Sequence, residues 1–232
     1  MSASGPGERT ASARDVAIYL REDCRTLQDS LQLEMVVAQY CLRIRDVLST
    51  TDIPVGDVVG AGVVATLEYE GDALSHAILR GLAHLAVGRT AERSAESAAV
   101  LDQRGVGLPE EFADVGKATA AGAWRTDAGA HDGEYVLFAE FEHPRGRRHA
   151  IAMFVDIGRE IAVKHLGLMS AVTEFDLPDP FHPDAMEPIE IAAAGMEISD
   201  LLERSYGELA TDTDDFRVLI AIARARSMVL AS

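Results

Sequence analysis

The segment from residue 134 to residue 156 constrains the fold more than any other part of the chain. It reads EYVLFAEFEHPRGRRHAIAMFVD, in which two segments rich in β-forming residues flank a polar turn around Pro144 and Gly146. This pattern predicts an antiparallel β-hairpin. A turn centred on Arg145 and Gly146 gives a register that places Glu142 opposite His149. Because most of the remaining chain has helical patterns, the hairpin is the expected nucleus of a small sheet.

The chain before the hairpin has helical periodicity. Apolar residues at steps of three and four predict one long helix over 15–49, or two helices joined near Asp29. A further helix is favoured from about residue 63, with a strand as the alternative. Short connections between helices indicate antiparallel neighbours. The other predicted helices are 73–87 capped by Asp72, 91–104 capped by Thr90, and a short helix over 109–115.

Around the hairpin, two further segments have strand patterns. Residues 119–126 and 160–165 would complete a three- or four-stranded antiparallel meander. A proline-rich loop follows, and then two helices over 188–210 and 213–230, the second capped by Thr213. The pattern predicts an α+β fold with an N-terminal helical layer, a β-meander and a C-terminal helical pair. The expected regions of one compact domain are a disordered tail (1–14), helices (15–116), sheet (117–170), loop (171–187) and helices (188–232).

Composition limits the classes of partner. The 232 residues carry a formal net charge of −17, which repels nucleic-acid backbones. It favours a basic protein partner or a divalent cation, although a solvated acidic surface is the simpler interpretation. No apolar core of a signal peptide follows the N-terminal residues, and no segment has the length of an apolar membrane span, so we expect a cytoplasmic protein without membrane association. Cys24 and Cys41 lie in helical sequence and are expected to be reduced and structural.

Three residues are candidates for catalysis. A carboxylate opposite an imidazole can raise the histidine pKa and orient its ring, so Glu142 and His149 could form a general base. The same two residues could equally be an ordinary cross-strand pair on the surface. Lys164 is the third candidate. The chain contains no Walker loop, no dinucleotide-binding glycine pattern and no serine-hydrolase elbow.

Carboxylates and a histidine near the predicted strand ends are candidates for a metal site. Oxygen and imidazole ligands of this kind could bind Mg²⁺, Mn²⁺ or Zn²⁺ if the strand ends converge at one rim. The candidate ligands are Asp132, Asp156, Glu160 and His165, with His131 and Glu134 nearby. Because they have no fixed spacing, their convergence is an assumption.

Two charged groups are candidates for binding a partner. Arg145, Arg147 and Arg148 lie in the hairpin turn, where they could bind an acidic group or form a solvated turn. Glu197, Asp200 and Glu203 follow helical spacing in the C-terminal region and could form an acidic docking surface or a solvated helix face. The amphipathic segment 15–49 could also form a homo-oligomer.

The central part of the chain, about residues 73–168, resembles a group of uncharacterised actinobacterial proteins. The resemblance rests on a Leu-Pro-Glu-Glu segment, Ala123-Trp124-Arg125, Pro144 with Gly146, and the segment from Ile161 to Lys164. In that group several helices precede such a hairpin, so the resemblance implies this architecture. It implies no activity. The group usually has an acidic residue where this chain has His165, which argues against a catalytic role for Lys164.

These observations favour a non-enzymatic interaction or regulatory protein with an acidic docking surface and no cofactor. The alternative is a small metal-dependent hydrolase that uses carboxylates and a histidine at the sheet rim. A third hypothesis is a small-ligand site between the sheet and the helices. Convergence of the candidate side chains on one point would distinguish the enzyme from the other two.

Overall fold

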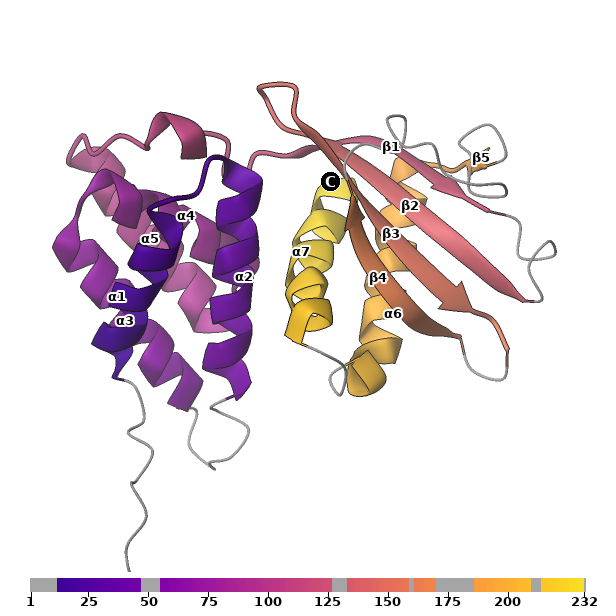
Figure 1. The fold of residues 1–232 in the computed structure, drawn as a ribbon, viewed down its shortest axis with the longest axis horizontal. Helices are drawn as coiled ribbons and strands as arrows, with labels where there is room; N and C mark the ends of the chain where they lie inside the picture. Colours follow the sequence, from indigo (N-terminus) through magenta and orange to yellow (C-terminus); the bar gives the residue numbers. More distant parts are fainter. Residues whose placement is uncertain are drawn as a thin grey trace, which may run out of the picture.

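The computed structural model describes residues 12–46, 55–126, 133–158, 161–169, 186–209 and 214–231. Helices from the first half of the chain form one lobe, and the sheet with the last two helices forms a second lobe beside it (Figure 1). The predicted α+β class and the helix–sheet–helix order are confirmed. Within the described residues, no helix is long and apolar enough to cross a membrane.

The first lobe, here called the helical lobe, contains five α-helices and a short 3-10 helix. Residues 25–29 separate the first two helices, so the alternative of two helices over this region is correct. The segment from about residue 63 is helical, as favoured, and its helix begins earlier. The elements are α1 (Ala13–Cys24), α2 (Ser30–Asp46), α3 (Val55–Glu70), α4 (Ala73–Leu85), α5 (Gly88–Gln103) and η1 (Glu110–Phe112).

Local hydrogen bonds explain where these helices begin. Asp72 caps α4 as predicted, because its carboxylate accepts a hydrogen bond of 2.8 Å from the Ser75 backbone N–H. The predicted cap at Thr90 is wrong, because α5 begins at Gly88 and includes Thr90. Thr90 instead lies against Gly60 of α3, where an added Cβ would overlap its hydroxyl oxygen. Thr90 therefore lies within α5, next to α3, and does not cap the helix.

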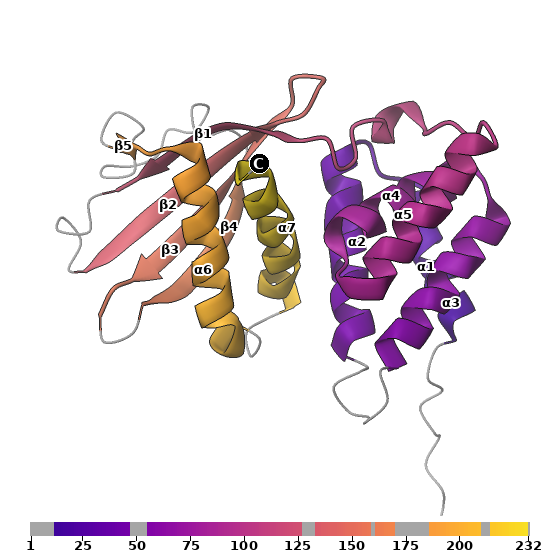
Figure 2. The same ribbon diagram turned by 180° about the vertical axis from the view of Figure 1, so that it is seen from behind.

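The second lobe, here called the sheet lobe, is built on an antiparallel sheet with the strand order β4-β3-β2-β1-β5. Helices α6 and α7 cover one face of this sheet (Figures 1 and 2). The meander is confirmed, and the short edge strand β5 is an addition that the sequence pattern did not predict. The elements are β1 (Thr119–Arg125), β2 (Glu134–Glu142), β3 (Arg148–Asp156), β4 (Ala162–Met169), β5 (Glu187–Pro188), α6 (Ile191–Leu209) and α7 (Asp214–Leu230).

The predicted register of the hairpin is wrong by one residue. Glu142 pairs with Arg148, and His149 pairs with Phe141. The reason is the loop: the His143 N–H donates to the Arg147 carbonyl at 2.8 Å, so the loop spans five residues and centres on Arg145 alone. Gly146 closes it with a φ of 79°, a left-handed conformation that suits glycine. A shift of one residue moves each β3 side chain to the opposite face, and His149 becomes buried.

The lobes share one hydrophobic core. The main cluster of buried side chains includes Leu33 and Leu82 in the helical lobe, and Leu137 and Ile222 in the sheet lobe. Helix α7 contacts α2 and α4 on one side and α6, β1 and β4 on the other. It is therefore the element through which the helical layer meets the sheet lobe (Figure 2). A smaller cluster around Phe138 covers the opposite face of the sheet.

Candidate functional site at the lobe junction

Polar side chains from both lobes meet where α2 and α4 face α7 and the hairpin. We call this group the junction cluster, and it comprises Glu34 of α2, His84 of α4, His149 of β3, Arg226 of α7 and His143 beside β2. Glu34 and Arg226 are both 0% exposed, and His143 and His149 are buried. Such burial is rare for charged residues that lack a partner. Among the described residues, the cluster therefore combines a fully buried acidic and basic residue with buried histidines.

Helical periodicity places the two charged residues in the core. Glu34 lies three and four positions before the buried residues Val37 and Ala38 of α2. Arg226 lies four positions after Ile222 and four before Leu230 of α7, both of which are buried. Each charged side chain thus belongs to the apolar face of its helix. When α2 packs on α7, the two opposite charges are brought together.

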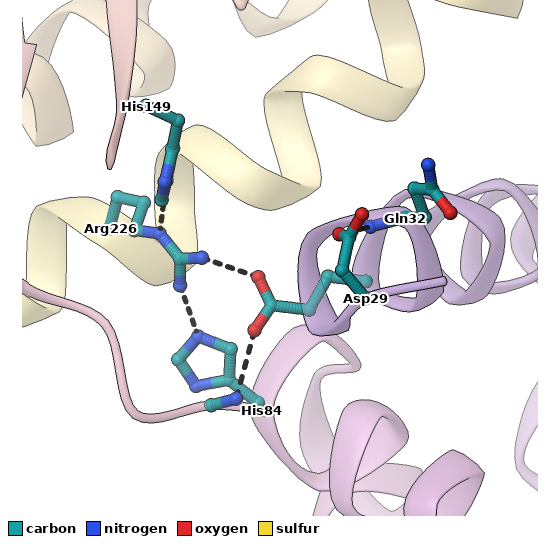
Figure 3. Close-up of polar contacts among 7 residues, drawn as sticks. Asp29, Gln32, His84, His149 and Arg226 are labelled. Carbon is teal, nitrogen blue, oxygen red and sulfur yellow. Dashed lines mark hydrogen bonds and ion pairs between the residues drawn. The ribbon is translucent and has the colours of Figure 1, made fainter. Parts of the chain in front are cut away.

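Arg226 is the centre of the cluster (Figure 3). One terminal guanidinium nitrogen donates to Glu34 Oε2, and the other lies 2.9 Å from His84 Nε2. Its Nε donates to His149 Nε2 at 3.1 Å. The second Glu34 oxygen, Oε1, accepts a hydrogen bond of 2.8 Å from the Gly116 backbone N–H. The guanidinium also lies 5.7 Å from the centre of the Phe141 ring.

These contacts fix the protonation of two histidines. A guanidinium donates hydrogen bonds and accepts none, so His84 Nε2 and His149 Nε2 must both be unprotonated acceptors. In the neutral rings the proton is therefore on Nδ1. For His149 this Nδ1 is buried and has no hydrogen-bond partner among the described residues. The cluster thus holds neutral imidazoles around a single ion pair.

Burial and charge favour the same neutral state. Burial, followed by the positive charge of Arg226 and by that of His143 when it is protonated, lowers the pKa of His149 to about 2. Burial is also the largest cause of the lowered pKa values of His84 and His143. For both of these residues the Glu34 carboxylate acts in the opposite direction, and Arg226 adds to the lowering. All three imidazoles are uncharged at neutral pH.

The chemistry available to this arrangement is that of a fixed, desolvated ion pair. Every nitrogen of the Arg226 guanidinium is engaged with a protein atom, and the side chain is 0% exposed. A substrate would have to displace Glu34 or a histidine to reach it. The groups bridge the two lobes, with Glu34 and His84 on one side and His149 and Arg226 on the other. The geometry therefore supports a structural role at the junction.

The structure does not bring the three catalytic candidates together. His149 is in the junction cluster, whereas Glu142 faces Arg148 on the other side of the hairpin, 3.0 Å from its guanidinium. Lys164 lies on the exposed rim of the sheet, 2.5 Å from Glu134 and 2.9 Å from Asp156. The predicted Glu142–His149 pair is therefore wrong, because the five-residue loop gives the hairpin a register that differs from the predicted one by one residue.

The metal-site candidates are only partly described. Asp132, Glu160 and the neighbouring His131 lie outside the described residues. Asp156 is paired with Lys164, and the His165 ring meets the Phe154 ring edge-on at 6.2 Å. In the part of the chain that the structure describes, no three His, Cys, Asp or Glu side chains are placed to hold a metal ion.

The two cysteines are free thiols, as expected. Burial raises the pKa of both Cys24 and Cys41 to about 12. They are therefore protonated and poorly nucleophilic at neutral pH.

Two of the three turn arginines face the helical lobe. Arg147 pairs with Asp29, whose carboxylate also accepts a hydrogen bond of 2.9 Å from the Gln32 N–H at the start of α2. Arg145 lies 3.5 Å from Asp114 and donates to the Glu110 carbonyl. Arg148 pairs with Glu142 instead. The turn thus adds contacts between the lobes at the edge of the junction.

The acidic candidates on α6 differ in their surroundings. Glu197 accepts a hydrogen bond of 2.6 Å from the Tyr135 hydroxyl and lies 3.6 Å from Arg125, so it serves packing of α6 on the sheet. Burial, and then this hydrogen bond, raises the pKa of Tyr135. Asp200 and Glu203 point to solvent, and Asp200 lies 3.7 Å from Arg204. Of the three acidic candidates on α6, only Asp200 and Glu203 are available to a partner.

Glu34, His84 and Arg226 were not among the site residues expected from the sequence. A signal was present: each charged residue falls on the apolar stripe of a helix, and the two signs are opposite. Periodicity alone could have proposed a buried ion pair between α2 and α7. The histidines could not have been added, because the sequence does not give the hairpin register or the position of α4.

Comparisons with known proteins add no relative to this description. No family model, no curated protein and no solved structure matches the chain.

Proposed function

We propose that the protein is a non-enzymatic interaction or regulatory protein that binds a basic partner on the outer side of α6. The observation that carries this proposal is an exposed helix face on which an apolar side chain lies among carboxylates. Met196 is 62% exposed, and Asp200 and Glu203 follow it at four and seven positions, on the same side of the helix. Exposed Glu190 precedes the helix. We call Glu190, Met196, Asp200 and Glu203 the α6 face.

The charges of the α6 face are available for binding. Among the described residues, the ion-pair partner of Asp200 is Arg204 of its own helix, at 3.7 Å, and both side chains are exposed. Exposed pairs of this kind contribute little to stability, so the fold does not require them. Glu197 in the same helix is the contrast, since Tyr135 and Arg125 occupy its carboxylate.

The chemistry of the face defines the partner. An exposed, flexible methionine adapts to varied apolar surfaces, and the flanking carboxylates attract lysine or arginine. The net charge of −17 adds a long-range attraction for a basic molecule and repels nucleic acids. A protein segment with basic residues on both sides of an apolar anchor matches this surface.

The test compares two charge-reversal variants of the full chain. Asp200→Lys with Glu203→Lys alters the α6 face, and Glu92→Lys with Glu96→Lys makes the same charge change on the exposed side of α5. Wild type and both variants are immobilised, and proteins retained from a lysate of the source organism are quantified by mass spectrometry. Circular dichroism confirms that each variant is folded.

We expect a basic protein that wild type and the α5 variant retain equally and that the α6 variant loses at least tenfold. Loss from both variants alike would show that the binding is non-specific attraction to acidic protein. Equal retention by all three proteins, or no protein retained by wild type, would overturn the proposal.

A further inference from the structure

The junction cluster joins elements that are distant in the sequence. Its groups come from α2, α4, the connection after η1, the hairpin and α7, and its hydrogen bonds meet at Arg226 or Glu34. A change in one of these hydrogen bonds therefore acts on the contact between the lobes, whatever the state of the elements within each lobe.

Protonation of a histidine would convert an attraction into a repulsion. His149 Nε2 and His84 Nε2 each accept from the Arg226 guanidinium. A proton on either nitrogen would place two N–H donors face to face and a second positive charge beside Arg226. The present arrangement cannot hold both the proton and the hydrogen bond.

In the closed arrangement, the carboxylates near the cluster are not free to neutralise the positive charge that protonation of a histidine would add. Facing the histidines are Glu34 from α2, Asp114 from the connection after η1, His143 from the hairpin and Arg226 from α7. Glu34 already accepts from Arg226 and Gly116. Asp114 lies 3.5 Å from Arg145. Among the described residues, each carboxylate near the cluster therefore already has a cationic partner. An added positive charge would have to be solvated by water.

We propose that the junction cluster is a proton-operated latch, in which protonation of His84 or His149 releases α7 and the hairpin from α2 and α4. In the closed state both imidazoles are neutral and the lobes are in contact. In the open state water solvates the imidazolium ions and the Arg226 guanidinium.

The direction of the response follows from linkage. The closed state lowers the pKa values of His84, His143 and His149, chiefly through burial. An imidazole in water titrates near pH 6.5, so the open state takes up protons that the closed state rejects. Acidification below about pH 6.5 therefore shifts the population toward the open state.

The experiment measures the distance between the lobes. Spin labels are attached at Glu96→Cys on α5 and Ser199→Cys on α6, two exposed positions in different lobes. Cys24 and Cys41 have thiol pKa values raised to about 12, which slows their labelling, and the unsubstituted chain provides the background. Distance distributions are recorded by pulsed electron resonance from pH 7.5 to pH 5.0, with circular dichroism to monitor secondary structure.

We expect a longer distance to appear as the pH falls, while the circular dichroism spectrum is unchanged. His84→Gln with His149→Gln keeps an acceptor near each Nε2 position but cannot titrate. In this variant the number of protons coupled to opening, read from the steepness of the pH response, should fall to one or fewer. The reason is that His143 is then the remaining histidine of the cluster that can titrate. His165→Gln, at an exposed position on β4, is the matched control and should respond as wild type does.

An interlobe distance that stays constant over this pH range with secondary structure intact would overturn the latch. An unchanged steepness of the pH response in the His84→Gln, His149→Gln variant would also overturn the latch. If that variant does not fold, His84→Gln and His149→Gln are measured singly, and each should reduce the number of coupled protons by about one. Neither variant alters the α6 face, so a failure of the latch leaves the proposed partner binding intact.

Discussion

Two charged clusters in this protein use the same kinds of residue in opposite surroundings. At the rim of the sheet, Lys164 pairs with Glu134 and Asp156, and all three side chains are in contact with solvent. At the lobe junction, Arg226 pairs with Glu34, and both are 0% exposed. The rim cluster connects β2, β3 and β4 within one sheet, whereas the junction cluster connects two lobes.

The difference shows that burial determines what an ion pair does. At the rim, water and salt screen the charges, and either partner can be solvated if the other is lost. At the junction, removal of one partner would leave a charge in the interior without compensation. The junction is therefore expected to be more sensitive to substitution and to protonation than the rim. Four predictions test this comparison, from the largest expected effect to the smallest.

The largest effect is expected at the centre of the junction. Arg226→Met should lower the free energy of unfolding by about 3–5 kcal/mol, because Glu34 would remain buried without its partner. Arg226→Met with Glu34→Met should recover most of this loss, since both desolvation penalties disappear together. Urea denaturation at pH 7.5 measures both values. If the double variant is as unstable as the single one, the loss comes from packing and the comparison fails.

Acid should destabilise the junction before it affects the carboxylates. The pKa values of His84, His143 and His149 are lowered in the folded state, so their contribution is complete above about pH 6.5 and decreases as the pH falls. Each histidine should remove up to about 1.4 kcal/mol per pH unit. For His149 this decrease continues toward its folded pKa of about 2.

The carboxylates affect the free energy of unfolding in a lower pH range than the histidines do. Arg21 holds the pKa of Asp72 below its usual range, so the contribution of Asp72 is lost only below about pH 4. Urea midpoints between pH 7.5 and pH 4.5 therefore isolate the histidines. The slope should decrease in His149→Gln and remain unchanged in His165→Gln. A flat profile over this window in wild type would contradict the expected titration.

The third prediction concerns Asp29 at the edge of the junction, where we expect an effect smaller than at Arg226 and larger than at Lys164. Its carboxylate caps α2 and pairs with Arg147 of the hairpin turn. Asp29→Ala should cost about 1 kcal/mol, because the helix cap is lost. Asp29→Asn retains a capping side chain and loses only the ion pair, so its cost should be clearly smaller. Equal losses would mean that the ion pair, and not the cap, dominates at this position.

The smallest effect is expected at the rim. Lys164→Met removes both exposed ion pairs, and the thermal midpoint should change less than in any of the variants above. The change should vanish in 1 M salt, where the Debye length is about 3 Å. A change in Lys164→Met as large as that in Arg226→Met would show that burial is not the deciding variable.

Much of the fold followed from patterns within short segments. The spacing of apolar residues predicted the helical first half and the C-terminal pair, and the alternation around Pro144 and Gly146 predicted the hairpin. Asp72 was identified as a cap because its hydrogen bond to Ser75 spans only three residues. Thr90 was misassigned because α5 begins two residues earlier, at Gly88, after an N-cap residue, Val87, that makes no side-chain cap hydrogen bond.

The candidate site depended on information that no short segment contains. His149 was identified as a polar residue of interest, but the sequence pattern paired it with Glu142 on the wrong face. One hydrogen bond across the loop, from the His143 N–H to the Arg147 carbonyl, sets the register that buries it. The acidic docking surface stays a prediction, and it rests on fewer residues because Glu197 contacts Tyr135 within the fold.

The sequence by itself determined the periodicity of each element, the net charge of −17 and the positions of Glu34 and Arg226 on apolar helix stripes. These properties follow from local geometry, since helical spacing places residues three and four apart on one face. The tertiary structure decided which stripes meet, and so which charges are paired and which imidazoles are neutral. Desolvation and hydrogen bonding act over a few ångströms in space, and residues 34, 84, 149 and 226 become neighbours only when the two lobes pack together.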